Sequence, residues 1–203
     1  MLLLLITACT NNELHEISQT PLQQEPQHEP LQEPQQEPPQ EPPQEPQQES
    51  QQEQEFVKLI NAGKINSSEI GIGDSTDELI QIKGQANEID YLWGGLYFSY
   101  DNILYLTDAA YDDDKNILNG RILIIVLGMG EEIYGLKLGS SSIDAAISIF
   151  GSGYLLNSPD DNTENFLLSD RWSYEFEFEN NNLIFTTDSE GGIIKEAYLW
   201  ANK

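Results

Sequence analysis

The chain has 203 residues and carries 35 Asp and Glu against 9 Lys and Arg, a formal net charge of −26 at pH 7. This charge argues against nucleic acid or anionic lipid as a direct partner and is compatible with cationic ligands, basic protein patches or divalent cations. The only cysteine is Cys9, and both histidines, His15 and His28, precede residue 56. Residues 56–203 therefore exclude Ser-His-Asp and Cys-His nucleophilic sites, His/Cys zinc sites and disulfides.

Cys9 has the sequence context of a bacterial lipobox, because it follows the apolar and small residues Leu3-Leu4-Leu5-Ile6-Thr7-Ala8. In a lipobox the Cys thiol is diacylglycerylated, and the Cys residue becomes the mature N-terminus. Residues 1–9 are then a truncated lipoprotein signal, and the protein is expected to be extracytoplasmic and anchored in the membrane through its N-terminal lipid. Secretory signals begin with a basic region, yet no Lys or Arg precedes Lys58. The recorded start is therefore expected to lie downstream of the true translation start.

Residues 10–55 are predicted to be a disordered tether. From Glu13 to Glu55 the chain consists mainly of Gln, Glu and Pro, and nine of the ten prolines lie there. Such a segment buries too little apolar surface to offset the entropy of ordering, and its prolines favour an extended polyproline II conformation. Its eleven carboxylates and lack of Lys or Arg add self-repulsion.

Residues 56–203 are predicted to form one globular α+β domain, in which two short helices have clear end signals. A first short helix is expected at 56–62. The next begins at Ser75, which with Glu78 forms a capping box, and ends at Gly84. A third begins near Ser141, with Asp144 as a shorter counterpart of the box, and ends at Gly151. Its apolar face is formed by Ile143, Ala146, Ile147 and Phe150.

Each of the two capped helices is followed by a predicted hairpin and a third strand. Alternating apolar and polar residues indicate half-buried antiparallel strands; these are expected at 96–100, 103–106, 172–178 and 183–185, with third strands at 122–127 and 193–200. Because residues 122–127 are apolar on both sides, that strand is placed centrally in its sheet. The fold class is therefore a tandem repeat of a short helix packed on an antiparallel sheet, with repeat one at 56–128 and repeat two at 129–203. A long loop within 153–170 is expected only in the second repeat.

Two kinds of candidate contact residue lie in predicted loops. Tyr91 and Trp93 flank the glycine pair Gly94-Gly95 and are candidate ligand contacts, whereas the aromatic stripe from Trp172 to Phe178 is assigned to the core. Acidic runs supply oxygen ligands of the kind that Ca²⁺ prefers; the possible metal ligands are Asp112, Asp113, Asp114, Asp160, Asp161 and Glu164. No other cofactor is expected.

Three functions remain open at this stage. The first is a non-catalytic binding or structural lipoprotein of the cell envelope, with an envelope protein as a possible partner. The second is a carboxylate-based hydrolase of wall glycan, which needs two acids facing each other at about 5–9.5 Å across a cleft. The third is a divalent-cation-binding surface protein.

The lipobox, the Pro-rich tether and the helix-plus-hairpin unit resemble the YjgB-like lipoproteins of bacilli. The unit is used twice, from Gly73-Asp74-Ser75 to Gly84 and from Gly139 to Gly151, and the resemblance covers roughly residues 59–199. More distantly, the unit is similar to lipoprotein modules of outer-membrane assembly and to the tandem-repeat β-lactamase inhibitor protein. The first resemblance implies location and shape without a reaction, and the inhibitor analogy implies protein binding.

Overall fold

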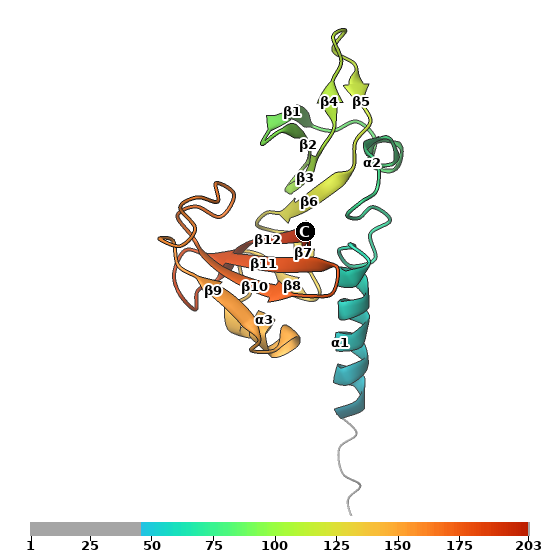
Figure 1. Cartoon of the computed structure of the whole chain (residues 1–203). Helices are drawn as coiled ribbons and strands as arrows, with labels where there is room; N and C mark the ends of the chain where they lie inside the picture. Colours follow the sequence, from blue (N-terminus) through green and yellow to red (C-terminus); the bar gives the residue numbers. More distant parts are fainter. Residues whose placement is uncertain (1–45, 203) are drawn as a thin grey trace, which may run out of the picture. The chain divides into compact units, whose positions relative to one another are not determined.

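The structure is a computed structural model that describes residues 46–202. Cys9 and residues 10–45 of the predicted tether lie outside the described residues. The described part is an α+β domain (Figure 1), as the sequence predicts, with three helices: α1 (Pro46–Asn61), α2 (Thr76–Lys83) and α3 (Ile143–Phe150).

Eight strands form one antiparallel sheet. In spatial order they are β1 (Glu88–Leu92), β2 (Gly95–Tyr100), β3 (Ile103–Thr107), β6 (Ile122–Leu127), β12 (Ile194–Ala201), β11 (Asn181–Thr187), β10 (Trp172–Glu177) and β9 (Tyr154–Asn157). Two small hairpins lie outside it, β4 (Ala110–Tyr111) with β5 (Ile117–Leu118) and β7 (Glu132–Ile133) with β8 (Leu136–Lys137). The order shows that β6 is central, as predicted, and that β1 and β9, which lie in segments expected to be loops, are the two edge strands.

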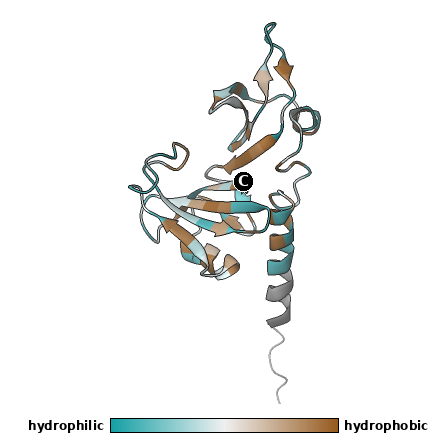
Figure 2. Cartoon of the chain, in the orientation of Figure 1, coloured by the Kyte–Doolittle hydropathy of each residue, from teal (hydrophilic) through white to brown (hydrophobic). Residues whose placement is uncertain are grey.

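The sheet buries apolar side chains on both faces. Because side chains alternate along a strand, one face carries the main core, which all three helices complete with Ile60, Leu79 and Ile143. The opposite face carries a smaller cluster, built from Leu106, Ile124, Val126, Leu168, Ile184 and Tyr198. Strand β6 supplies residues to both clusters and is coloured as hydrophobic along its length in Figure 2. The aromatic stripe of β10 lies in or against the main core, as predicted.

Helix α1 begins ten residues earlier than the helix expected at 56–62, so residues 46–55 of the predicted tether are helical. Gln and Glu are good helix formers, and Pro46 is tolerated at the first helical position because its missing N–H would have no intrahelical partner. The helix end is fixed by β11: the Asn181 side chain donates to the Ile60 carbonyl at 2.7 Å, and that of Asn180 donates to the Asn61 carbonyl at 3.1 Å. These amides satisfy carbonyls that a helix C-terminus leaves unpaired.

Helices α2 and α3 begin differently. Ser75 forms the predicted capping box, since its Oγ accepts from the Glu78 N–H and its own N–H donates to the Glu78 carboxylate at 2.9 Å. These bonds from Ser75 lower the pKa of Glu78. The cap predicted at Ser141 is wrong: Ser142 is the N-cap of α3 and makes no side-chain capping bond. The Ser141 Oγ instead accepts from the Lys137 N–H at 2.9 Å, in the turn that precedes the helix.

This contrast predicts unequal effects of two matched substitutions. Ser75→Ala should lower the free energy of unfolding by about 1 kcal/mol, the usual contribution of an N-cap side chain, whereas Ser142→Ala should change it by less than about 0.5 kcal/mol. The difference should shrink at acid pH, because the lowered pKa of Glu78 gives stability that is lost as the pH falls through that pKa. Urea denaturation of both variants at pH 7 and pH 3 measures this, and equal losses at pH 7 would contradict it.

Candidate functional site

A groove of about 480 Å³ lies on the face of the sheet opposite the helices. We call it the amide groove, because its lining is rich in Asn. Its lining residues are Asn157, Asn162, Asn165, Leu168, Glu175, Glu177, Phe178, Asn182, Ile184, Trp200, Ala201 and Asn202.

The pairing of β10, β11 and β12 determines which residues form the floor of the groove. Glu177 of β10 pairs with Asn182 of β11, and Asn182 pairs with Trp200 of β12, so these three residues form one row across three strands. Directly opposite residues share a face of the sheet, which brings a carboxylate, an amide and an indole together. Glu175 and Ile184 form the neighbouring row.

Residues 158–171 connect β9 to β10 and form one wall of the groove. Leu168 is 4% exposed and packs on the sheet, and the Tyr198 hydroxyl lies 2.9 Å from the Leu167 carbonyl oxygen. Arg171 at the end of the segment pairs with Glu196 of β12 at 3.0 Å. The long loop expected within 153–170 is therefore present, after strand β9, and it contributes Asn162, Asn165 and Leu168 to the groove.

The amide groups of the groove are oriented by the protein. Asn162 donates to the Arg171 carbonyl at 2.9 Å and to Ser173 Oγ at 3.1 Å, Asn182 donates to Glu175 at 2.5 Å, and Asn202 donates to the Phe178 carbonyl at 2.7 Å. Carbonyl and carboxylate oxygens are acceptors only, so each amide must present its NH₂ to the protein. The Oδ1 of Asn182 is buried without a partner, and those of Asn162 and Asn202 accept no hydrogen bond from the described residues. These three amides leave their oxygens as acceptors, whereas Asn165, whose Oδ1 accepts from the Leu167 N–H at 3.2 Å, keeps its NH₂ as a donor toward the groove.

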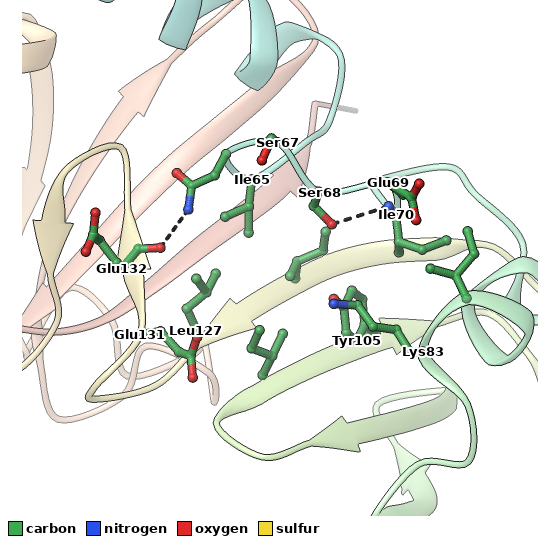
Figure 3. Close-up of a pocket in the computed structure, with 14 residues that line it drawn as sticks. Ile65, Ser67, Ser68, Glu69, Ile70, Lys83, Tyr105, Leu127, Glu131 and Glu132 are labelled. Carbon is green, nitrogen blue, oxygen red and sulfur yellow. Dashed lines mark hydrogen bonds between the residues drawn. The ribbon is translucent and has the colours of Figure 1, made fainter.

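A second cavity of about 290 Å³, the loop pocket, lies under residues 65–70 on the helix side of the sheet (Figure 3). Asn66 fixes this loop to the β7–β8 hairpin, since its Nδ2 donates to the Glu132 carbonyl at 2.8 Å and its Oδ1 accepts from the Tyr134 N–H at 2.7 Å. Tyr105 lines the pocket and is 2% exposed, and its hydroxyl makes no hydrogen bond with the described residues. Burial, with smaller contributions from Tyr100 and Glu131, raises the pKa of Tyr105 to about 12.

Tyr91 and Trp93 do not come together. Tyr91 lies in β1 rather than in a loop, and it pairs with Leu96, which faces the main core. The Tyr91 side chain is 57% exposed at the sheet edge. Trp93 follows β1 with φ of +52° and is 62% exposed, and its ring lies perpendicular to that of Trp200 with centroids 5.6 Å apart. Of the two candidates, only Trp93 therefore lies beside the amide groove.

The acidic runs form turns. Asp112 accepts from the Asn116 N–H at 2.7 Å and from its side chain at 2.9 Å, and these bonds lower the pKa of Asp112. Asp161 accepts from the Ser158 hydroxyl and N–H, which lower its pKa in the same way. The other candidate ligands are exposed: Asp113, Asp114, Asp160 and Glu164. Within residues 46–202, no group of three or more His, Cys, Asp or Glu side chains is arranged to hold a metal ion.

The main groove residues were not predicted from the sequence. Residues 180–182 were expected to form a turn, whereas β11 begins at Asn181 and Asn182 faces the groove. The only available signal was the alternation of Asn182 with Leu183, which puts an amide on the face opposite the core. Trp200 was placed in a strand, with nothing to indicate which strand lies beside it.

The described part of the chain thus belongs to the mixed α+β class, with one antiparallel sheet and helices on one face. Among solved structures, it is similar to a DUF4309 family protein (YjgB) from Bacillus subtilis subsp. subtilis strain 168, with 13% sequence identity and a TM-score of 0.44; the match covers 75% of this chain and 97% of that chain. This is the group that the sequence resemblance names. No family model and no curated protein matches the chain.

The buried tyrosines predict a loss of stability in alkali. Burial raises the pKa of Tyr105 to about 12 and also raises those of Tyr134 and Tyr198. The unfolded chain ionises its phenols near pH 10, so it releases protons first, and stability should fall as the pH rises from about 10 to 12. The thermal midpoint at pH 8, 10 and 11 measures this fall.

Two phenylalanine variants separate burial from a general effect of alkali. Tyr105→Phe should reduce the alkaline fall in the midpoint, whereas Tyr111→Phe, at a side chain that is 42% exposed, should leave it unchanged. An alkaline fall of the same size in both variants would contradict the assignment to Tyr105.

Proposed function

We propose that the protein is a lipid-anchored, extracytoplasmic, non-catalytic binding module of the cell envelope. Cys9 carries the lipid, the residues after it act as a spacer, and the domain is a tandem repeat of a helix and an antiparallel sheet. The binding role is supported above all by the amide groove, an open recess on the helix-free face with acceptors that the protein leaves unpaired.

Equivalent backbone hydrogen bonds support the repeat. The Gly73 N–H donates to the Ile122 carbonyl at 2.8 Å, and the Gly139 N–H donates to the Ile194 carbonyl at 2.7 Å. In return, the Ile122 N–H donates to Asp74 and the Ile194 N–H donates to Ser141, each at 2.9 Å. Each capped helix is thus tied at its start to the last strand of its own half.

The strand order supports the same interpretation. The order β1-β2-β3-β6 is followed by β12-β11-β10-β9, so the halves mirror each other about the β6–β12 pair. A register shift occurs at Thr107 in β3 and at Thr187 in β11. The halves differ by insertion: β4 and β5 lengthen the first, and residues 158–171 lengthen the second.

The carboxylates of the amide groove support binding rather than hydrolysis. Glycosidases place two acids on either side of the scissile bond, whereas Glu175 and Glu177 both come from β10 and lie two residues apart on the same face. Glu175 is also engaged by Asn182 at 2.5 Å. The arrangement favours holding a ligand over cleaving it.

The anchor is supported by the sequence around Cys9 and by the Gln-Glu-Pro segment after it. A diacylglyceryl group with a second, amide-linked acyl chain meets the two-signal requirement for stable membrane attachment. Among residues 46–202, no helix has both the length and the apolar character needed to cross a membrane.

Lipidation of Cys9 predicts membrane retention. With the full native signal present, Cys9→Ala should release the protein into the medium, whereas Ser18→Ala, a small substitution in the same N-terminal segment, should leave it with the membranes. Fractionation and immunoblotting measure the distribution. Retention of the Cys9→Ala variant with the membranes would contradict the proposed anchor.

The binding role predicts position-dependent crosslinking in intact cells. A photo-crosslinker at Asn165, on the loop wall of the groove, should give a specific adduct, because a bound ligand would lie within its reach. The same group at Lys115, in the β4–β5 turn, should give none. Identical adduct patterns from the two positions would argue against the groove as the binding site.

A further inference from the structure

We propose that the amide groove binds a saccharide, specifically a chain of pyranose units whose hydroxyl or ammonium groups donate hydrogen bonds. This assignment rests on the binding role proposed above and names its ligand class.

The hydrogen-bonding capacity of the groove suits a ligand with several donors and with acceptors for the NH₂ of Asn165. The NH₂ groups of Asn162, Asn182 and Asn202 are taken by the protein, so their Oδ1 atoms remain as acceptors. The Oδ1 of Asn182 is buried, so the acceptors that remain for a ligand are the Oδ1 atoms of Asn162 and Asn202. A ligand that donates to these two oxygens would complete their hydrogen bonding.

The positions of the acceptors favour a sugar over a single cationic side chain. Asn162 comes from the loop wall, Asn182 from β11 and Asn202 from the end of the chain after β12. A lysine ammonium groups its donors at one point, whereas a pyranose distributes hydroxyls around a ring. Polar side chains from three separate elements match the second pattern.

Aromatic side chains supply the apolar surface that a sugar ring requires. Trp200 lines the groove together with Ile184, whereas the ring of Phe178 packs toward Phe150 on the helix side of the sheet. Trp93 packs against Trp200 with ring planes at 90°, and this contact restrains the indole. The negative face of an indole attracts the weakly positive C–H groups of a pyranose ring. Apolar walls with a few oriented polar groups are the usual composition of a small-molecule site.

The carboxylates of the groove determine which ligand charge is favoured. Glu175 and Glu177 line it, and among residues 46–202 no Lys or Arg does. Uronic acids and other anionic sugars are therefore disfavoured, and a free amino group on the sugar is favoured. Because the amides are already held by the protein, little side-chain ordering is needed on binding.

Isothermal titration calorimetry tests the ligand class with defined probes. The protein is the full-length chain carrying Cys9→Ala, at about 0.15 M salt so that long-range attraction to its net charge is screened. We expect saturable binding of a β-1,4-glucosamine tetrasaccharide, weaker binding of cellotetraose, and no binding of tetragalacturonate. Failure of both the glucosamine and glucose tetramers to bind at millimolar concentration would overturn the proposal.

Matched variants locate the site. Trp200→Leu removes the ring but keeps an apolar side chain. It should weaken the binding of both sugars by about tenfold or more, which corresponds to about 1.4 kcal/mol. Glu177→Gln should abolish the preference for the glucosamine tetramer and leave cellotetraose binding unchanged, whereas Glu190→Gln, in the exposed β11–β12 turn, should preserve that preference. Thermal melts check that each variant is folded. Sugar binding that survives both Trp200→Leu and Glu177→Gln would place the site elsewhere and overturn the proposal.

Two further outcomes separate this inference from the proposed function. If a tetra-arginine peptide binds in a Trp200-dependent manner and the sugars do not, the saccharide assignment is overturned while the binding role stands. If cellotetraose binds and chromatography then shows shorter products, the ligand class is supported and the non-catalytic role falls.

Discussion

The antiparallel pair of β6 and β12 is the interaction on which the whole domain depends. Four residues of each strand pair, from Ala197 with Leu127 to Trp200 with Ile124, and they join two four-stranded groups into one sheet. A strand in this position has neighbours on both edges and apolar layers on both faces. This is why β6 is nearly continuous in apolar residues and why its partner carries Leu199 on one face and Tyr198 on the other.

The two faces of the sheet that this pair joins are covered differently. Three helices cover one face, and their contacts close the main core. Among residues 46–202, only the segment 158–171 lies over the opposite face, and the small cluster around Ile124 and Ile184 is flanked by a recess. The amide groove occupies this recess. It combines a partly buried polar floor with Asn182, whose Oδ1 is buried without a partner among the described residues, an arrangement that costs stability.

The polar segment over that face is anchored at several points. Asn162 is 5% exposed and bonds to the Arg171 carbonyl, and Arg171 pairs with Glu196 while Tyr198 reaches the Leu167 carbonyl. The loop therefore presents its amides in fixed positions. Fixed acceptors beside an indole are what distinguish this recess from the exposed acidic turns at Asp112 and Asp161, whose carboxylates are satisfied by their own turns.

Local signals in the sequence determined the elements that depend on neighbouring residues alone. The capping box at Ser75, the end of α2 at Gly84 and the central position of 122–127 could be predicted, because caps and apolar runs act over a few residues. The same reasoning placed the Ser141 cap wrongly, since that hydroxyl is taken by the Lys137 N–H in the preceding turn. It also ended the tether too late, because Gln and Glu without Pro favour helix as well as disorder.

The amide groove was decided by tertiary structure. Glu177, Asn182 and Trp200 are close only because β10, β11 and β12 pair in one register, and Trp93 reaches Trp200 from the other half of the sheet. No local pattern encodes which strands become neighbours across more than a hundred residues. The sequence by itself determined composition, charge, the lipobox pattern and the periodicity of the strands. Strand pairing determined which polar residues share a face, because that depends on contacts between segments far apart in the chain.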